Sequence, residues 1–260
     1  MRAALTYVYC LVRAPRRPSL RGVPAAMPGG EAVRLLDAGD TTWLVVSSVP
    51  EHDYGEAALE RGLQNLDWVG RRALAHEAVV EHFLDAPALL PMQLFALFTA
   101  DERAVAHVAR DRRRINRILD RVERQHEWGL RLTWDGTAAR EKVEAAHGAG
   151  KASGAGRASG KAYLARKRDL LDVNRSQLVA ARAEANRLYR AMSREATAAR
   201  RRTETEKAAA GSRLLLDAAF LVPVKRASAF RAALRRNARK LEGSGVAVAL
   251  TGPWPAYNFI

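Results

Sequence analysis

The first fifty residues place apolar runs between turn-forming residues, which is the pattern of short strands. Residues 3–12 are apolar, aromatic and β-branched, so they predict a buried strand. A loop is predicted at 15–30, where four prolines and three glycines occur. Two further strands are predicted at 32–36 and 42–48, joined by a hairpin turn at Ala38-Gly39-Asp40.

The spacing of apolar residues changes after Pro50. From residue 56 to 84 they recur every three or four positions, which predicts one helix or two helices broken near Gly70. The nearly continuous apolar run at 89–98 predicts a buried strand. An apolar stripe predicts a helix from Asp101 to about Arg124. Alternation at 127–134 then predicts another strand.

The composition changes again beyond residue 134. Residues 145–160 are mostly Gly, Ala and Ser with Lys and Arg between them, which predicts a flexible connection. Residues 162–206 contain no Gly or Pro and predict one long helix or a hairpin of two helices. The remaining elements are predicted in order: a strand at 214–222, a helix at 227–241 that ends at Gly243, and a strand at 246–251.

This order of elements predicts an α+β fold with two domains. Residues 1–124 would form an N-terminal α+β domain and residues 125–251 a second domain, followed by a tail at 252–260. The second domain reads as a modified ferredoxin-like (split β-α-β) fold with a long helical insertion, although one of its strands has no clear signal in the sequence.

The chain carries 43 Lys and Arg against 28 Asp and Glu, a formal net charge of +15. Such a charge attracts polyanions, acidic protein faces and anionic lipid surfaces. The arginines cluster twice, at Arg110, Arg112, Arg113, Arg114 and Arg117 and again at Arg200, Arg201 and Arg202. A basic, non-specific nucleic-acid-binding protein is therefore the alternative function. Zinc-finger spacings and base-stacking aromatic residues beside the clusters are missing, which favours a solvated or protein-facing surface.

The sequence offers no catalytic constellation. The segment from His76 to His82 resembles a zinc-protease helix, but its two histidines are six residues apart, or roughly 240° around a helix, and cannot hold one ion from one face. Cys10 is the single cysteine and lies in an apolar run, as a small buried residue would. We therefore predict no catalytic residue, no metal and no cofactor.

The sequence predicts neither an export signal nor a membrane-spanning helix. After Met1 the apolar residues soon meet arginines without a small-residue cleavage site. No stretch reaches the roughly 18 apolar residues that a transmembrane helix needs. The expected localisation is the cytoplasm.

Six short motifs occur along the chain in a defined order: Tyr7-Val8-Tyr9, Ala75-His76-Glu77-Ala78-Val79, Leu90-Pro91-Met92-Gln93-Leu94-Phe95, Glu127-Trp128-Gly129, Gly160-Lys161-Ala162-Tyr163-Leu164, and the closing residues 250–259. In this order they resemble the GvpL/GvpF family of gas vesicle proteins. The closing Leu-Thr-Gly-Pro-Trp-Pro-Ala-Tyr-Asn-Phe is the most specific, since the family form is Leu-Thr-Gly-Pro-Trp-Pro-Pro-Tyr-Ser-Phe. The third motif departs from the family's Leu-Pro-x-x-Phe-Gly-Thr, because its Gly and Thr are absent.

The resemblance implies two α+β domains, the second a modified ferredoxin-like fold. It implies a non-enzymatic minor component, associated with gas vesicles, that contacts the small hydrophobic shell protein and other accessory proteins during vesicle formation. It implies no cofactor. The family-pattern residues in this chain are His76, Glu77, Pro91, Glu127, Trp128, Gly129 and Tyr163.

The closing segment is the candidate organising element. Its residues of interest are Gly252, Pro253, Trp254, Pro255, Tyr257 and Phe259. The two prolines each lack an amide donor, so the segment is not expected to extend a sheet. Its aromatic rings either dock within the chain and lock the two domains together, which we favour, or engage a partner. His76 and Glu77 are interpreted as a buried hydrogen-bonded pair.

Overall fold

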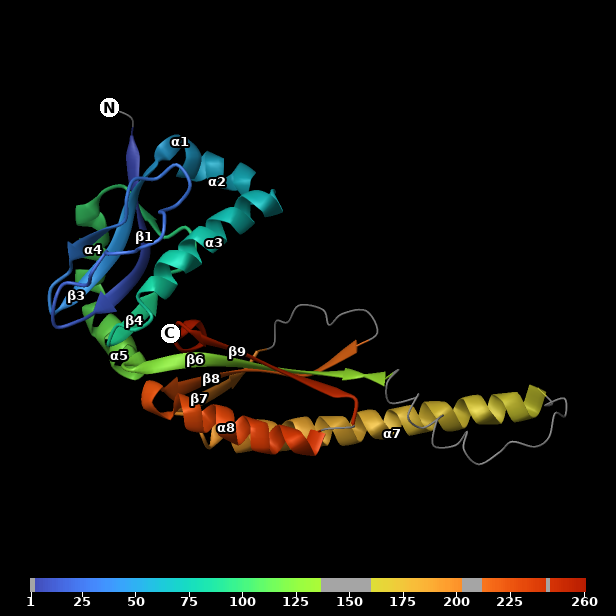
Figure 1. Ribbon diagram of the computed structural model, residues 1–260. Coiled ribbons are helices and arrows are strands. Elements are labelled where there is room, and N and C mark those ends of the chain that lie inside the picture. Colours follow the sequence, from blue (N-terminus) through green and yellow to red (C-terminus); the bar gives the residue numbers. More distant parts are fainter. Residues whose placement is uncertain (1–2, 137–159, 203–211, 242–243) are drawn as a thin grey trace. The chain divides into compact units, whose positions relative to one another are not determined.

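The structure is a computed structural model that describes residues 3–136, 160–202, 212–241 and 244–260 (Figure 1). The chain divides into two compact units. The N-terminal unit comprises residues 1–127 together with 253–260, and the C-terminal unit comprises residues 128–252. The connection predicted to be flexible, 145–160, lies outside the described residues except for Gly160.

The sheet of the N-terminal unit is antiparallel, in the order β2-β3-β1-β4, with β5 pairing β1 as well. Its strands are β1 (Ala4–Arg13), β2 (Arg34–Asp37), β3 (Thr42–Pro50), β4 (Ala88–Pro91) and β5 (Leu97–Phe98). The predicted first three strands and the turn at residues 38–40 are confirmed. Gly39, Asp40 and Thr41 all have positive φ, which the tight turn requires.

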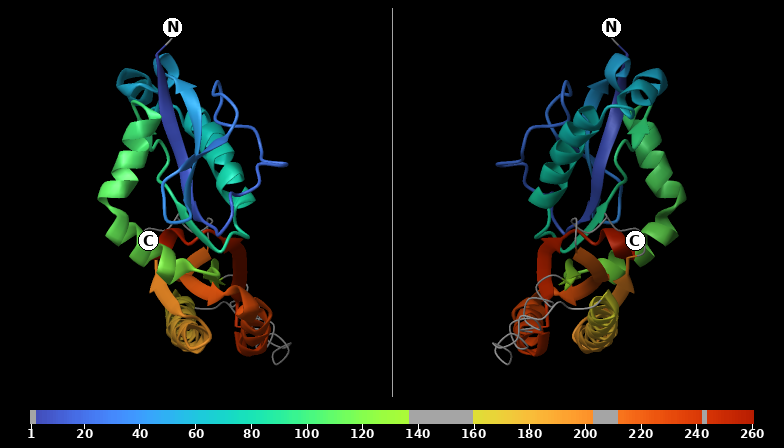
Figure 2. Two further views of the ribbon diagram at one scale, coloured as in Figure 1. Left: turned by 90° about the vertical axis from the view of Figure 1, so that its left-hand side faces the viewer. Right: turned by 90° about the vertical axis from the view of Figure 1, so that its right-hand side faces the viewer.

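Helices cover both faces of this sheet (Figure 2). On one side lies α3 (Leu66–His82), preceded by α1 (Glu51–Tyr54) and α2 (Glu56–Gly62). On the other side lie α4 (Asp101–Arg110) and α5 (Arg112–Val122). Because both faces are covered, the central strand β1 is buried from Thr6 to Val12, which explains its continuous apolar sequence.

One predicted break falls elsewhere than expected, and a second break was not predicted. The helical region after Pro50 is interrupted at residues 63–65, not near Gly70, because the Asn65 side chain accepts the Trp68 amide at 3.1 Å and begins α3 there. The second helical region is interrupted at Asp111, which separates α4 from α5. An apolar stripe continues across such a break, so periodicity alone does not reveal it.

The predicted strand at 89–98 is two strands with an irregular segment between them. β4 pairs with residues 10–13 of β1, and β5 pairs with Thr6 and Tyr7 of the same strand. Between them Phe95 adopts a positive φ of 67°, which turns the chain. Apolarity predicted the burial of this run, but the pairing partner decided where the strands begin and end.

The C-terminal unit has a four-stranded sheet in the order β7-β8-β6-β9. Its elements are β6 (Gln125–Asp135), α7 (Gly160–Ser193), β7 (Ala198–Arg201), β8 (Ser212–Pro223), α8 (Ala227–Ala238) and β9 (Val246–Trp254), with 3₁₀ turns at Val224–Arg226 and Arg239–Leu241. Two helices, α7 and α8, lie side by side against one face of this sheet (Figure 2). The core between the layers includes Leu130, Leu132, Phe220 and Phe230, each at most 1% exposed.

Two expectations for this unit are wrong. The helix predicted at 162–206 ends at Ser193, and the strand without a clear sequence signal is β7, whose residues pair antiparallel with β8. Strand β9 continues through Pro253 to Trp254, although we expected the prolines to prevent this. Since β9 is at the edge of the described sheet, a residue without an amide donor can face its open side. The predicted helix stop at Gly243 lies outside the described residues.

Candidate functional site

The last six residues form a tight turn within the N-terminal unit. The Tyr257 amide donates to the Pro255 carbonyl at 2.8 Å, and the Phe259 amide donates to the Ala256 carbonyl at 3.0 Å. This 3₁₀ turn spans Tyr257–Phe259 and leaves Ala256 and Phe259 only 2% exposed. Trp254, just before the turn, is 39% exposed. The three aromatic rings of the tail therefore have different environments.

Two polar anchors hold this turn. The buried carboxylate of Glu127 accepts the Asn258 amide at 2.8 Å and the Asn258 side-chain amide at 2.6 Å, one on each oxygen. The Arg121 guanidinium donates to the Phe259 carbonyl at 3.2 Å. A buried carboxylate that receives two hydrogen bonds is well satisfied. Glu127 thus has a definite structural task in this chain, which is to hold the tail.

His76 is buried beneath the turn, 3% exposed, on the face of α3 that meets β1. Its Nδ1 lies 2.7 Å from the Tyr7 hydroxyl, and that hydroxyl also accepts the Phe95 amide at 3.3 Å. The imidazole stacks on the Tyr9 ring at a centroid distance of 5.8 Å. Burial lowers the pKa of His76 from 6.5 to about 4, so the ring is neutral at pH 7.

Glu77 faces the tail instead of His76. Burial raises the pKa of its carboxyl, the neighbouring Tyr257 hydroxyl lowers it, and Glu81 raises it further. Burial and the closeness of Glu77 raise the pKa of Tyr257 in turn. The predicted hydrogen-bonded pair of His76 with Glu77 is therefore wrong. Consecutive helical residues point about 100° apart, so one side chain meets β1 and the other meets the tail.

These side chains line a pocket of about 430 Å³. Its walls come from α3, from the end of β4 and the segment after it, and from the tail: Ala73, His76, Glu77, Pro91, Met92, Gln93, Leu94, Tyr257 and Ile260. Four of the candidate residues, His76, Glu77, Pro91 and Tyr257, thus meet at one place although they lie far apart in the sequence. We call the pocket and the docked turn the tail site.

The remaining candidate residues lie outside the tail site. Trp128 is 5% exposed in the core of the C-terminal unit, against Phe230 at 6.3 Å. Gly129 leaves no room for a side chain, because a Cβ there would lie 2.6 Å from the Thr251 hydroxyl and 3.0 Å from the Arg202 guanidinium. Tyr163 lies within α7, where side chains before residue 175 are outside the described part.

Two candidates near the start of the tail have backbone roles. Gly252 lies within β9 and has a φ of +112°, a backbone conformation that disfavours any other residue. Pro253 is exposed and Pro255 is buried. The tail therefore changes from an exposed strand end to a buried turn within three residues.

Sequence reasoning missed one buried charge cluster. Asp217 on β8 has a side chain only 2% exposed, and it accepts from Arg131 at 3.1 Å and from Arg202 at 2.6 Å. Arg202 belongs to the second arginine cluster that we had marked as a candidate polyanion surface. Another member, Arg201, donates to Asn186 at 2.6 Å and lies over the Tyr189 ring. An isolated Asp inside an apolar strand sequence was the available signal.

Comparison with known proteins identifies the family. The model of the family described as gas vesicle synthesis protein GvpL/GvpF matches residues 5–260. The chain belongs to the GvpL/GvpF family. A relative named gas vesicle protein L, from Streptomyces sp. (strain CB03234), is 32% identical over 239 residues, covering 89% of this chain and 84% of the relative.

Two solved structures share the fold. The crystal structure of gas vesicle protein GvpF from Anabaena sp. PCC7120 has a TM-score of 0.67 at 13% identity, covering 98% of this chain and 95% of the other. GvpF from Microcystis aeruginosa has a TM-score of 0.62 at 14% identity, covering 99% and 98%. At these identities the likeness shows the mixed α/β fold with its two sheets and no more.

The described residues contain no group of three or more His, Cys, Asp or Glu side chains that could hold a metal ion. Among them there is also no helix long and apolar enough to cross a membrane. Cys10 is fully buried, as expected, and burial raises the pKa of its thiol. A buried neutral thiol is a poor nucleophile.

Lowering the pH from 7 to 5 should destabilise the protein through His76. Between pH 7 and pH 5 the unfolded chain takes up a proton at this residue and the folded chain does not. The free energy of unfolding therefore decreases by about 2 kcal/mol as the pH is lowered from 7 to 5. Glu77 has the opposite effect on stability just above pH 4.5. Its pKa is raised in the folded chain, so there the folded chain binds a proton that the unfolded chain does not. Urea unfolding at both pH values measures the difference.

The control for this effect is His76→Gln, which keeps a polar side chain but cannot titrate. The difference between pH 7 and pH 5 should shrink in this variant, whereas His52→Gln, at an exposed site, should behave as the parent does. An unchanged difference in His76→Gln would show that other groups cause the acid sensitivity.

Phe95 stands where the family pattern has glycine, at a φ of 67°. Its ring stacks on Trp68 at 5.5 Å. Phe95→Ala removes the ring packing but keeps a side chain at a strained positive φ. Phe95→Gly removes the ring packing as well, but it also relieves the backbone strain. We therefore expect the glycine variant to be more stable than the alanine variant by about 1 kcal/mol in thermal or urea unfolding.

The same two substitutions at Phe98 provide the matched comparison. Phe98 lies in β5 with an ordinary strand backbone. Glycine should therefore be the less stable of the two there, because it only adds freedom to the unfolded chain. If alanine is the more stable at position 95 as well, backbone strain at that site is negligible.

Proposed function

We propose that this chain is a non-enzymatic accessory protein of gas vesicle assembly that binds the small hydrophobic shell protein and other accessory proteins. The observation that supports it most is the family match over residues 5–260. The name of the Streptomyces relative supports the same role. We further propose that the protein acts in the cytoplasm, in association with gas vesicles, and takes no cofactor.

The tail site supports binding in preference to catalysis. His76 is neutral at pH 7 and its Nδ1 lies 2.7 Å from the Tyr7 hydroxyl, and the Glu77 carboxyl lies beside Tyr257, so these two side chains make contacts within the fold. An acid–base catalyst needs a titratable group that can reach a substrate. The side chains at the tail site instead hold the last turn of the chain in place.

We interpret the two units as two domains, the second with a ferredoxin-like fold. In support, β6, α7, β7, β8, α8 and β9 follow the β-α-β-β-α-β order, and the sheet order β7-β8-β6-β9 suits that topology. The lock hypothesis for the tail stays a prediction.

Nucleic-acid binding is the alternative function, and one observation weakens it. Arg202 and Arg201 of the second arginine cluster are engaged by Asp217, Asn186 and Tyr189. They are therefore less available for an extended phosphate track, which non-specific binding requires.

The test is co-purification of the tagged protein with the shell protein after nuclease treatment, at about 0.15 M and about 0.5 M salt, because phosphate contacts weaken steeply over this range. Shell protein retained at both salt concentrations is the expected result. Recovery of nucleic acid alone at low salt, with all protein partners lost after nuclease, would favour the alternative.

A further inference from the structure

The first arginine cluster lines a hollow on the surface of the N-terminal unit. The hollow has a volume of about 660 Å³ and is lined, along the end of α4 and the start of α5, by Ala109, Arg110, Asp111, Arg112, Arg113, Arg114 and Arg117. The lining thus contains five guanidinium groups and one carboxylate. We call this feature the arginine hollow.

The arginines of the hollow differ in how they are held. Arg112 pairs with Asp40 and donates to the Ala38 carbonyl at 2.8 Å, so it is part of the fold. Arg110 contacts His107 at 2.9 Å and Asp111 at 3.5 Å, yet its side chain is 71% exposed. A like-charged cluster is costly unless an anion lies among its members.

Three further arginines form no ion pair with a carboxylate among the described residues. Arg113, Arg114 and Arg117 are exposed, and within the described parts of the chain no carboxylate pairs with their side chains. The Arg117 Nε–H donates only to the Arg113 carbonyl, at 3.3 Å. At about 100° per residue these three positions share one face of α5.

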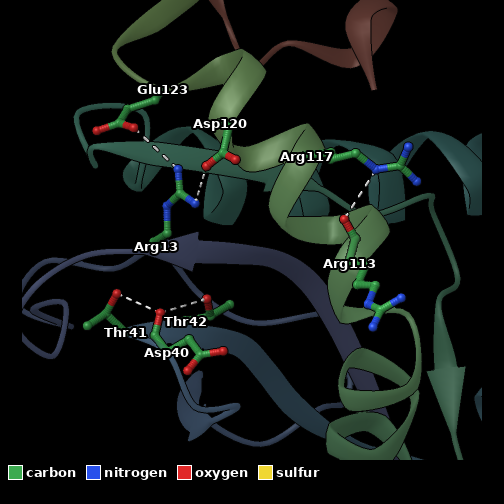
Figure 3. Close-up of polar contacts among 8 residues, drawn as sticks. All are labelled: Arg13, Asp40, Thr41, Thr42, Arg113, Arg117, Asp120 and Glu123. Carbon is green, nitrogen blue, oxygen red and sulfur yellow. Dashed lines mark hydrogen bonds and ion pairs between the residues drawn. The ribbon is translucent and has the colours of Figure 1, made fainter.

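Carboxylates near the C-terminal end of α5 show what neutralises an arginine in this protein. There Arg13 reaches from β1 to Asp120 at 2.6 Å and to Glu123 at 3.3 Å (Figure 3). In the same view the side chains of Arg113 and Arg117 extend away from Arg13 (Figure 3). Among the described residues, carboxylates therefore neutralise Arg13 but not Arg113, Arg114 or Arg117.

We propose that the arginine hollow is a docking site for an acidic segment of a partner protein. Guanidinium groups bind carboxylates in a paired geometry, and a set of them on one helical face matches carboxylates presented at similar spacing. The part of the hollow on α5 is short, about 8 Å from Arg112 to Arg117 at 1.5 Å per residue, which suits a few side chains of one segment.

Two observations favour an acidic protein segment over a nucleic acid. The residues that line the hollow include no aromatic ring on which a base could stack. In the C-terminal unit, Arg202 and Arg201 have partners of their own, so these two arginines of the second cluster are less available to a phosphate backbone. The proposal goes beyond the accessory role, since it specifies the chemistry of a partner.

The experiment measures binding of a fluorescein-labelled oligo-glutamate peptide of about eight residues to the full chain by fluorescence anisotropy, at about 0.05 M salt, where screening is weak. The test variant is Arg113→Ala/Arg114→Ala/Arg117→Ala. The control variant, Arg16→Ala/Arg17→Ala/Arg21→Ala, removes the same charge from exposed positions of the same unit. Both variants change surface residues, and circular dichroism checks that each is folded.

We expect the test variant to bind the peptide about tenfold more weakly or worse, and the control variant to change affinity by less than about twofold. Equal losses in both variants would overturn the proposal, because net charge alone would then explain binding. No binding to the parent would also overturn it. So would tighter binding of an oligonucleotide of equal charge with the same dependence on the three arginines.

The assay contains neither the shell protein nor any other accessory protein, so its outcome is independent of the proposed accessory role. Failure of the shell-protein co-purification would leave peptide binding at the hollow intact. Failure of peptide binding would leave the co-purification result intact.

Discussion

Replacing Phe259 with alanine is expected to lower the free energy of unfolding by about 3 to 4 kcal/mol, the cost of deleting a large ring from a packed site. The ring is 2% exposed, and the turn that carries it is held by Glu127 and by Arg121. The hydrogen bonds keep the turn in place, so the substitution leaves a cavity where the ring was, and this cavity causes the loss of stability. Urea unfolding followed by circular dichroism measures it.

Trp254→Ala is the matched control in the same tail. Its ring is 39% exposed, so its removal should cost less than about 1 kcal/mol. Equal destabilisation by the two variants would mean that the exposed ring is packed in solution and that the described difference in burial does not hold.

The same pair of variants separates the two hypotheses for the tail. If the rings serve docking within the chain, Phe259→Ala should unfold more easily and Trp254→Ala should keep its partners in the co-purification. If the tail contacts a partner, Trp254→Ala should stay folded and lose that partner. Exposed aromatic side chains are frequent anchors in interfaces, which makes Trp254 the residue to test.

Asp217→Ala is the second substitution with a large expected effect, a loss of about 3 kcal/mol in the free energy of unfolding. The carboxylate is 2% exposed and accepts from Arg131 and Arg202, so its removal leaves two guanidinium groups close together without their counter-charge. Part of this cost is relieved because both arginines are partly exposed. Urea unfolding of the variant and the parent provides the measurement.

The pair of Arg226 with Glu195, at 2.9 Å, is the matched control in the same unit. Both of its side chains are more than 30% exposed, so Glu195→Ala should cost less than about 1 kcal/mol. A loss at Asp217 no larger than the loss at Glu195 would show that the buried cluster contributes little to stability.

Local sequence determined most of the elements, because a strand or helix that buries one or both faces must repeat its apolar residues at a matching period. The run at residues 3–12 and the residues 38–40 between two strands are examples, since the signal lies within a few neighbouring residues. The family was likewise recognisable from the sequence, because the closing motif is specific and the earlier motifs follow in order.

Only the tertiary structure decided the features that depend on distant partners. Residues Ala198–Arg201 have no strand-like pattern, yet they form strand β7 because their backbone pairs antiparallel with β8. The side chains of His76 and Glu77 have different partners. His76 contacts Tyr7, which lies 69 residues earlier in the chain, and Glu77 contacts Tyr257 of the tail. Hydrogen bonds, burial and pKa shifts of this kind arise between residues that the chain brings together only when it folds, so no local pattern records them.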